Sequence, residues 1–279
     1  MGQQSKKSYA QQAKERREQL DKEKKAKESK QNKLLFGILG GVLAVILIAV
    51  VIIVGATRPK NGTDPKTTVP TTTAPKMEEI DLTPIEGDLS ETYTATDTAT
   101  DLVRMTVSYT TKAGVKKQGD IYIRLFPDVA PITVANFKNL VGSGFYNGLT
   151  FHRIYPGFMI QGGDPNGDGT GSSGTNIKGE FSANGVENNL SHTRGVISMA
   201  RGSYSMDSAS SQFFIVHSDA AAASLDGMYA SFGYVVSGME TVDEITEIQL
   251  VKKSGSIDSV ATSPVHPVTI ESAVFVTKQ

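Results

Sequence analysis

The pattern of apolar and polar residues divides the chain into a long apolar run and a later segment of alternating residues. Every residue from 34 to 54 is apolar or glycine. At 1.5 Å rise per residue, such a helix matches the roughly 30 Å hydrocarbon core of a bilayer. Residues 1–33 lack apolar periodicity. We therefore predict a single transmembrane helix over residues 34–54 and a folded domain over residues 97–279.

Within the predicted domain, the alternation has the period of β-strands. Apolar side chains recur at every second position over residues 103–109 and 121–125, with a turn-forming segment between them, which predicts an antiparallel strand pair. The other strand candidates are residues 195–200, 212–216, 232–236 and 268–276. The domain is therefore predicted to be mainly β.

Two segments of this domain carry a helical pattern. The first begins at Pro131, which suits a first helical turn, and ends at Gly142, a residue favoured at helix C-termini. The second begins near Met239 and places Val242 and Ile245 on one face. Several strands with only two helices predict a closed or nearly closed antiparallel barrel, with the helices over its ends.

The residues between the apolar run and the domain are rich in threonine and proline. Four prolines occur between positions 59 and 75, and the following residues stay polar. This composition buries little core and favours extended, semi-stiff backbone. We therefore expect a stalk over residues 55–96 and a domain boundary near Asp97.

The net charge of -1 conceals a strong asymmetry. Residues 1–33 hold eleven Lys/Arg against five Asp/Glu and so carry +6, which leaves -7 for the remainder. A basic run can indicate nucleic-acid binding, but this one directly precedes an apolar span, so membrane topology explains it better and no nucleic-acid partner is expected. Residues 1–33 are then cytoplasmic, and everything after Arg58 is extracytoplasmic. The apolar run is longer than that of a cleaved signal peptide, which favours an uncleaved single-pass signal anchor in the cell membrane.

Composition also limits the chemistry. The chain has no cysteine, which excludes disulfides, thiolate catalysis and zinc-thiolate sites. Its four histidines are too scattered to suggest a metal site. Residues 164–169 match the first half of a calcium-binding loop, but the twelfth position is Thr175 instead of glutamate, so we interpret them as a turn-rich loop. A serine hydrolase lacks support, because no G-x-S-x-G motif is present.

The most informative stretch for chemistry is FHRIYPGFMIQGGD, at residues 151–164. It is followed by SMA at 198–200, SQFFI at 211–215 and LDG at 225–227. Together with the helix from Pro131, these segments closely resemble the signature segments of the cyclophilins, a family of peptidyl-prolyl isomerases. The resemblance covers roughly residues 97–278 and implies an eight-stranded antiparallel barrel capped by two helices.

The resemblance also implies roles for individual residues. Arg153 corresponds to the family's catalytic arginine. The residues implied to line the pocket for the proline ring are Phe158, Met159, Phe214 and Leu225. Those matching positions that contact the substrate backbone or the preceding residue are Gln161, Gly169, Ala200 and Gln212. Tyr229 is expected to cover one pocket wall.

These residue types suit rotation about an X-Pro bond. The barrier of about 18–20 kcal/mol arises from delocalisation of the nitrogen lone pair, which is regained in the twisted transition state. A directed N–H donor on a fixed cation binds that state better than the planar ground state, and arginine supplies one. We therefore predict a peptidyl-prolyl cis-trans isomerase that uses neither metal nor cofactor and assists the folding of extracytoplasmic, proline-containing polypeptides.

Three residues depart from the usual family pattern. Ser224 replaces a frequent tryptophan, Tyr229 a histidine and Arg201 an asparagine. The missing indole removes an apolar contact and a donor at the pocket rim, so we expect weaker binding of cyclosporin-type ligands. The alternative function is a low-turnover module that binds proline-bearing segments at the cell surface as a chaperone. We expect a monomeric catalytic domain, and the anchor, the stalk and the lack of cysteine and tryptophan suggest a Gram-positive type of bacterium.

Overall fold

The computed structural model describes residues 74–279, apart from residues 88 and 255. The basic segment 1–33, the predicted span 34–54 and the first part of the predicted stalk lie outside the described residues. Among the described residues, no helix combines the length and hydropathy needed to cross a bilayer.

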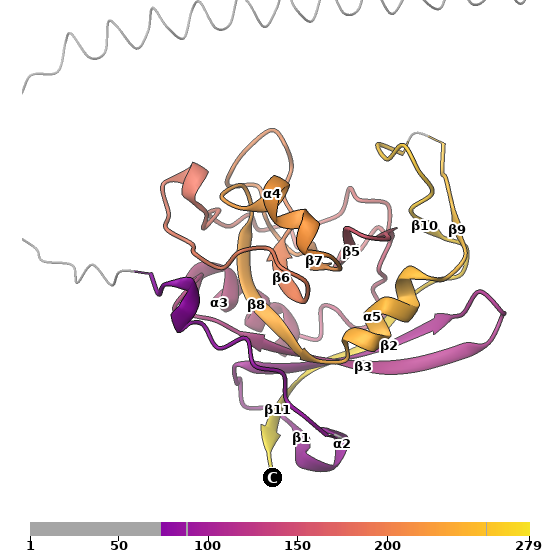
Figure 1. The fold of residues 1–279 in the computed structure, drawn as a ribbon, viewed down its shortest axis with the longest axis horizontal. Helices are drawn as coiled ribbons and strands as arrows, with labels where there is room; N and C mark the ends of the chain where they lie inside the picture. The colour runs from indigo at the N-terminus through magenta and orange to yellow at the C-terminus, as the bar shows by residue number, and fades with distance from the viewer. Residues whose placement is uncertain (1–73, 88, 255) are drawn as a thin grey trace, which may run out of the picture. The chain divides into compact units, whose positions relative to one another are not determined.

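Nine antiparallel strands form the main sheet (Figure 1). In chain order they are β1 (Tyr93–Thr96), β2 (Leu102–Thr110), β3 (Lys116–Leu125), β4 (Arg153–Tyr155), β5 (Met159–Gly162), β6 (Val196–Met199), β7 (Phe213–Val216), β8 (Ala230–Ser237) and β11 (Thr269–Lys278). Their order in the sheet is β1-β11-β2-β3-β8-β6-β7-β5-β4. The short strands β9 (Leu250–Val251) and β10 (Ser263–Pro264) pair separately. The mainly β fold and its antiparallel pairing are therefore confirmed.

The prediction of a closed or nearly closed, eight-stranded barrel is confirmed only as a mainly β fold, because the described sheet is not shown to close. The described sheet has nine strands, and its two edge strands, β1 and β4, do not pair with each other. Its ends approach each other through single bridges, in which Thr150 pairs with both Thr269 of β11 and Asp164, just beyond β5. The additional strand is β1, which comes from residues assigned to the stalk.

The folded unit begins upstream of the predicted boundary near Asp97. Strand β1 pairs with β11, with Tyr93 opposite Lys278, and it follows η1 (Met77–Glu79) and α2 (Leu89–Thr92). Leu89 is buried in a small apolar cluster with Val276. The composition of this segment did not indicate a strand, because an edge strand is held by backbone hydrogen bonds, which polar residues form equally well.

Two helices lie where the pattern predicts them, α3 (Pro131–Gly142) and α5 (Met239–Thr246). The N-cap residue of α3 has no capping side chain. The carboxylate of Glu180 replaces it, accepting hydrogen bonds from the backbone N–H groups of Ile132 (3.0 Å) and Thr133 (2.7 Å). The short elements η2 (Ser182–Asn184), η3 (Asp219–Ala221) and α4 (Ala222–Leu225) were not predicted.

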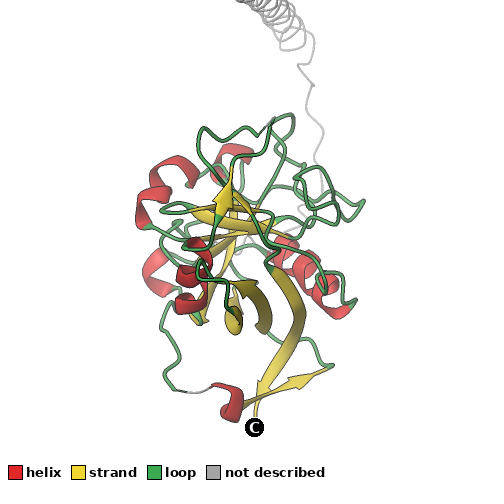
Figure 2. Ribbon diagram, turned by 90° about the vertical axis from the view of Figure 1, so that its right-hand side faces the viewer, coloured by secondary structure: helices red, strands yellow, loops and turns green. Residues whose placement is uncertain are grey.

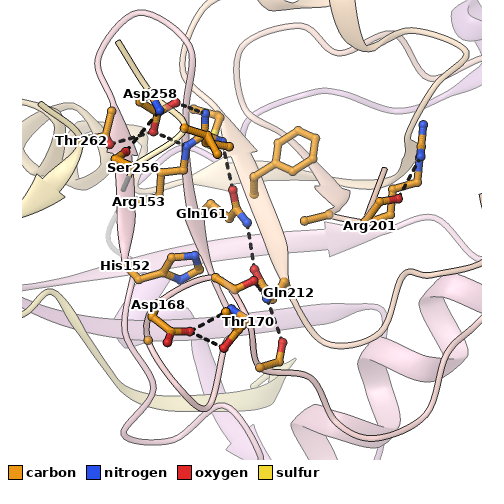
Figure 3. Close-up of a pocket in the computed structure, with 18 of the residues that line it drawn as sticks. His152, Arg153, Gln161, Asp168, Thr170, Arg201, Gln212, Ser256, Asp258 and Thr262 are labelled. Carbon is orange, nitrogen blue, oxygen red and sulfur yellow. Dashed lines mark hydrogen bonds and ion pairs between the residues drawn. The ribbon is translucent and has the colours of Figure 1, made fainter. Parts of the chain in front are cut away.

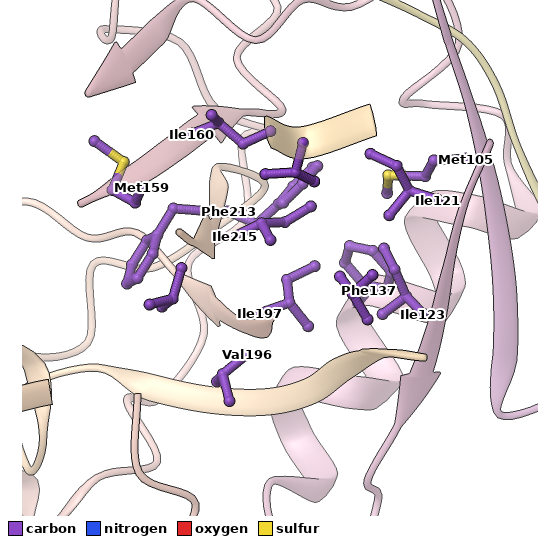
Figure 4. Packing of buried hydrophobic residues seen from close by; sticks show 14 of the residues in the cluster. Met105, Ile121, Ile123, Phe137, Met159, Ile160, Val196, Ile197, Phe213 and Ile215 are labelled. Atoms are coloured by element: carbon purple, nitrogen blue, oxygen red, sulfur yellow. The ribbon is translucent and has the colours of Figure 1, made fainter. Parts of the chain in front are cut away.

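The core lies between the strands and α3 (Figure 4). Phe137 of α3 contacts Phe213 of β7 edge-on, with ring centroids 5.7 Å apart, and both rings are fully buried. Because neighbouring strand residues point to opposite faces, Phe214 lies on the face of β7 opposite to that of Phe213. Figure 2 shows the helices flanking the strands, with most loops gathered at the end opposite the C-terminus. The candidate site lies among those loops.

Candidate active site

A cavity of about 770 Å³ lies beside β4, β5 and β7 and the loops that surround them (Figure 3). All ten residues predicted for the site line it, namely Arg153, Phe158, Met159, Gln161, Gly169, Ala200, Gln212, Phe214, Leu225 and Tyr229. The chain thus brings together side chains that are up to 76 residues apart in sequence. Their individual roles in binding and catalysis stay predictions.

The floor of the cavity is apolar. Met159, Phe214 and Leu225 line it and are otherwise almost completely buried. The Tyr229 ring meets that of Phe214 edge-on, with centroids 5.8 Å apart. Phe158 lines the cavity one residue before Met159. This surface suits a small apolar ring and excludes water from one side of it.

Arg153 lies on β4, directly opposite Gln161 of β5. Its Nε donates to Asp258 Oδ2 at 2.7 Å, and its Nη2 donates to Asp258 Oδ1 at 2.6 Å. Its Nη1 donates to Gln161 Oε1 at 3.2 Å. The guanidinium is therefore held on two sides by hydrogen bonds (Figure 3).

A chain of amide hydrogen bonds continues from Arg153 along the cavity wall. Gln161 Nε2 donates to Gln212 Oε1 at 2.9 Å. Gln212 Nε2 in turn donates to the backbone carbonyls of Gly169 (3.0 Å) and Gly171 (2.8 Å). Because each amide both donates and accepts, the orientation of one side chain determines that of the next. Four of these five residues, all except Gly171, were singled out from the resemblance.

Sequence reasoning missed Asp258, which lies in the loop between β9 and β10. Its side chain is 6% exposed, against 24% for Arg153. The hydrogen bonds from Arg153 hold the pKa of Asp258 below its usual value, and a bond from Thr262 adds to this effect. The two partners are 105 residues apart, and the serine-rich loop around Asp258 matches no motif. No local signal in the sequence could have paired them.

Arg201 and Tyr229, two of the three departures, contact each other, and Arg201 lies across the cavity from Arg153 (Figure 3). The Arg201 guanidinium lies 5.0 Å from the ring centroid of Tyr229 and 5.3 Å from that of Phe181. It also donates to the carbonyls of Met228 and Gly202. The hydroxyl of Ser224, the third departure, donates to the carbonyl of Ala221, the last residue of η3. An arginine stacked on two rings therefore supports this side of the cavity.

The loop that resembles half a calcium site is closed by its own hydrogen bonds. The carboxylate of Asp164 accepts from the backbone N–H groups of Asn166, Asp168 and Gly169. Asp168 accepts in turn from Thr170. Both of these carboxylates thus organise a turn at the cavity edge.

His192 joins Asp226 and Ser198 beneath the cavity floor. Its Nδ1 lies 2.8 Å from Asp226 Oδ1 and its Nε2 lies 2.9 Å from Ser198 Oγ, the connectivity of a serine hydrolase. Ser198 is completely buried, however, and does not line the cavity. The imidazole instead stacks against Phe214, with centroids 6.0 Å apart. Burial lowers the pKa of His192, so it supports the floor as a neutral ring.

The fold and site together define a mainly antiparallel β domain with an apolar-floored cavity beside a fixed arginine. Residues 106–274 match the family described as cyclophilin type peptidyl-prolyl cis-trans isomerase/CLD. The chain therefore belongs to the cyclophilin family of peptidyl-prolyl cis-trans isomerases, enzymes of class EC 5.2.1.8.

The segments that match this chain cover most of the length of each relative. The chain is 44% identical to peptidyl-prolyl cis-trans isomerase B of Bacillus subtilis over 133 residues, which cover 48% of this chain and 87% of that protein. It is 43% identical to peptidyl-prolyl cis-trans isomerase A of Dickeya dadantii over 165 residues, covering 57% and 81%. Among solved structures, a Cryptosporidium parvum cyclophilin type isomerase crystallised in the presence of the dipeptide Ala-Pro is 31% identical, with a TM-score of 0.48, covering 61% of this chain and 97% of that one.

Proposed function

We propose that this chain accelerates cis-trans isomerisation of X-Pro bonds in extracytoplasmic polypeptides and thereby assists their folding. The observation that carries the proposal is the placement of Arg153 beside an apolar cavity, with its guanidinium held by Asp258 and Gln161. No nucleophile is required, because the reaction breaks no covalent bond.

In the proposed reaction, the apolar floor formed by Met159, Phe214 and Leu225 holds the proline ring still while the preceding carbonyl turns. Gln161 and Gln212 offer polar atoms to the substrate backbone, and Gly169 and Ala200 permit its close approach. As the bond twists, the prolyl nitrogen recovers its lone pair and accepts an N–H from Arg153. This hydrogen bond exists only near the transition state, so it lowers the barrier without tightening ground-state binding.

The proposal places the enzyme outside the cytoplasm of a bacterium, on a single-pass membrane anchor. Its support is the apolar run at residues 34–54, preceded by a segment of charge +6. Protease treatment of intact cells tests it, with digestion of the catalytic domain as the expected result. A domain that stays protected until the membrane is permeabilised would refute this topology. The catalytic domain is proposed to act as a monomer, which light scattering of the purified chain can check.

Activity is tested on the full-length chain in mild detergent, by exchange NMR of an Ala-Pro-Phe peptide or by a protease-coupled assay. Arg153→Ala is expected to lower kcat/KM by about 10²–10³-fold, the usual effect of removing a transition-state donor. Arg194→Ala is the matched control, because Arg194 also pairs with an aspartate, Asp243 at 2.7 Å, and does not line the cavity.

The alternative is a binding module with little turnover, favoured by the altered rim at Arg201, Ser224 and Tyr229. A wild-type chain that binds proline peptides but isomerises them no faster than Arg153→Ala would support it and refute the enzyme.

A further inference from the structure

We propose that Asp258 is a positioning residue for isomerisation, which fixes the plane of the Arg153 guanidinium and thereby selects the N–H groups available to a substrate. The inference rests on the proposed activity and assigns a function to the loop between β9 and β10. It concerns a residue that does not itself touch the prolyl bond and acts only through Arg153.

The contact has the geometry needed to fix a plane. Both carboxylate oxygens of Asp258 accept from the same edge of the guanidinium, at 2.7 Å from Nε and 2.6 Å from Nη2. Two parallel bonds between planar groups prevent rotation about the long arginine side chain, which a single bond would permit. Asp258 is also the more buried partner, with 6% of its side chain exposed. The carboxylate is thus the fixed half of the pair.

Asp258 and Gln161 occupy only some of the N–H groups of the Arg153 guanidinium. A guanidinium has five N–H groups. Asp258 takes one on Nε and one on Nη2, and Gln161 takes one on Nη1. One N–H on Nη1 and one on Nη2 have no partner among the residues that the structure describes. Asp258 and Gln161 therefore leave one N–H on each terminal nitrogen of the guanidinium for a bound substrate.

Asp258 is itself tied to the strand that carries Arg153. Its Oδ2 accepts from the hydroxyl of Thr262 at 2.8 Å. The carbonyl of the same Thr262 accepts from the backbone N–H of Ile154, the residue after Arg153, at 2.7 Å. The two halves of the ion pair therefore belong to segments joined by a backbone hydrogen bond beside them. Such a closed arrangement restricts the position of Asp258 relative to Arg153.

The carboxylate has two opposing effects on catalysis, and geometry decides between them. It withdraws part of the positive charge of Arg153, which alone would weaken transition-state binding. The prolyl nitrogen is a neutral acceptor, however, and a hydrogen bond to it weakens steeply as the N–H angle departs from linearity. Alignment therefore outweighs net charge, and loss of Asp258 is expected to slow the reaction.

The test measures kcat and KM for Asp258→Ala and Asp258→Asn in the full-length chain, with Asp243→Asn as the matched control. Asp243 is likewise paired with an arginine, but it does not line the cavity. Asp258→Ala is expected to lower kcat on the order of tenfold, the cost of a misaligned catalytic group, and to leave KM within about twofold. Asp258→Asn has the same shape and keeps one acceptor, so its kcat should fall between those of wild type and Asp258→Ala.

A double variant separates positioning from general damage. If Asp258 acts only through Arg153, adding Asp258→Ala to Arg153→Ala changes the rate no further. A further loss in that background overturns the proposal, as does a kcat for Asp258→Ala equal to or above that of wild type. A rise in KM at unchanged kcat also overturns it. An inactive wild type would instead refute the proposed function itself.

Discussion

Replacement of Arg201 by alanine removes the support of one cavity wall without touching Arg153. The guanidinium lies 5.0 Å from the Tyr229 centroid and 5.3 Å from the Phe181 centroid. Partly exposed contacts of this kind contribute about 0.5–1 kcal/mol each, so both together contribute about 1–2 kcal/mol. The hydrogen bonds to the Met228 and Gly202 carbonyls exchange for water at little cost. If the whole loss appears in substrate binding, KM rises by about 5- to 30-fold, since about 1.4 kcal/mol corresponds to a factor of ten.

The assay is exchange NMR of an X-Pro peptide at several concentrations, which separates kcat from KM. We expect kcat to stay within about twofold of wild type, because the bonds among Arg153, Asp258 and Gln161 do not involve Arg201. Arg201→Lys is the matched control, since it keeps the charge but stacks less well on aromatic rings, and its KM should be intermediate. A lowered kcat at unchanged KM would show that this side of the cavity contributes to the chemical step, and the reasoning would be wrong.

Three further predictions concern stability. Glu180→Ala should lower the free energy of unfolding by about 2–4 kcal/mol in urea titrations, because the N-terminus of α3 loses its charged cap; a loss below about 0.5 kcal/mol would contradict this role. Gly238→Ala should lower the thermal midpoint more than Gly114→Ala. Both glycines have positive φ, but a Cβ at Gly238 meets a backbone oxygen at 2.1 Å while that at Gly114 meets nothing. Burial lowers the pKa of His192 and of His152 from 6.5, so both resist protonation in the folded state. Their contribution to the free energy of unfolding is complete above pH 6.5 and declines as the pH falls through their lowered pKa values. A thermal midpoint that stays level from pH 7 to 5 would refute this contribution.

The parts of the fold that the sequence predicts are those with local signals. The bounds of α3 follow from Pro131 and Gly142, and the alternation in β2 is reproduced as alternating burial. Strand β1 was not predicted because each of its faces carries one exposed and one half-buried residue, so its four residues show no periodic pattern. The helix α4 has four residues, too few for a helical period to show.

The candidate site likewise has a part that the sequence predicted and a part that it could not predict. The resemblance selected ten residues that the fold gathers around one cavity, and it marked Arg201 and Tyr229 as unusual. It could not show that these two stack on each other, since that contact depends on how a loop folds back. Asp258 was missed for a related reason, because its partner is distant in sequence and its neighbours are ordinary loop residues. Family patterns select the candidate site residues, whereas contacts such as that of Asp258 with Arg153 become visible only in the folded chain.

Strand β1 has a consequence for how copies of the protein behave toward one another. It occupies the edge of β11, a strand of ten residues, while the opposite edge strand β4 has only three. Without β1, the backbone N–H and C=O groups that residues 275–278 of β11 turn toward it would be unpaired and free to join the same edge of a second molecule. A chain shortened to begin at Asp97 should therefore self-associate, because residues 93–96 no longer cover that part of the edge.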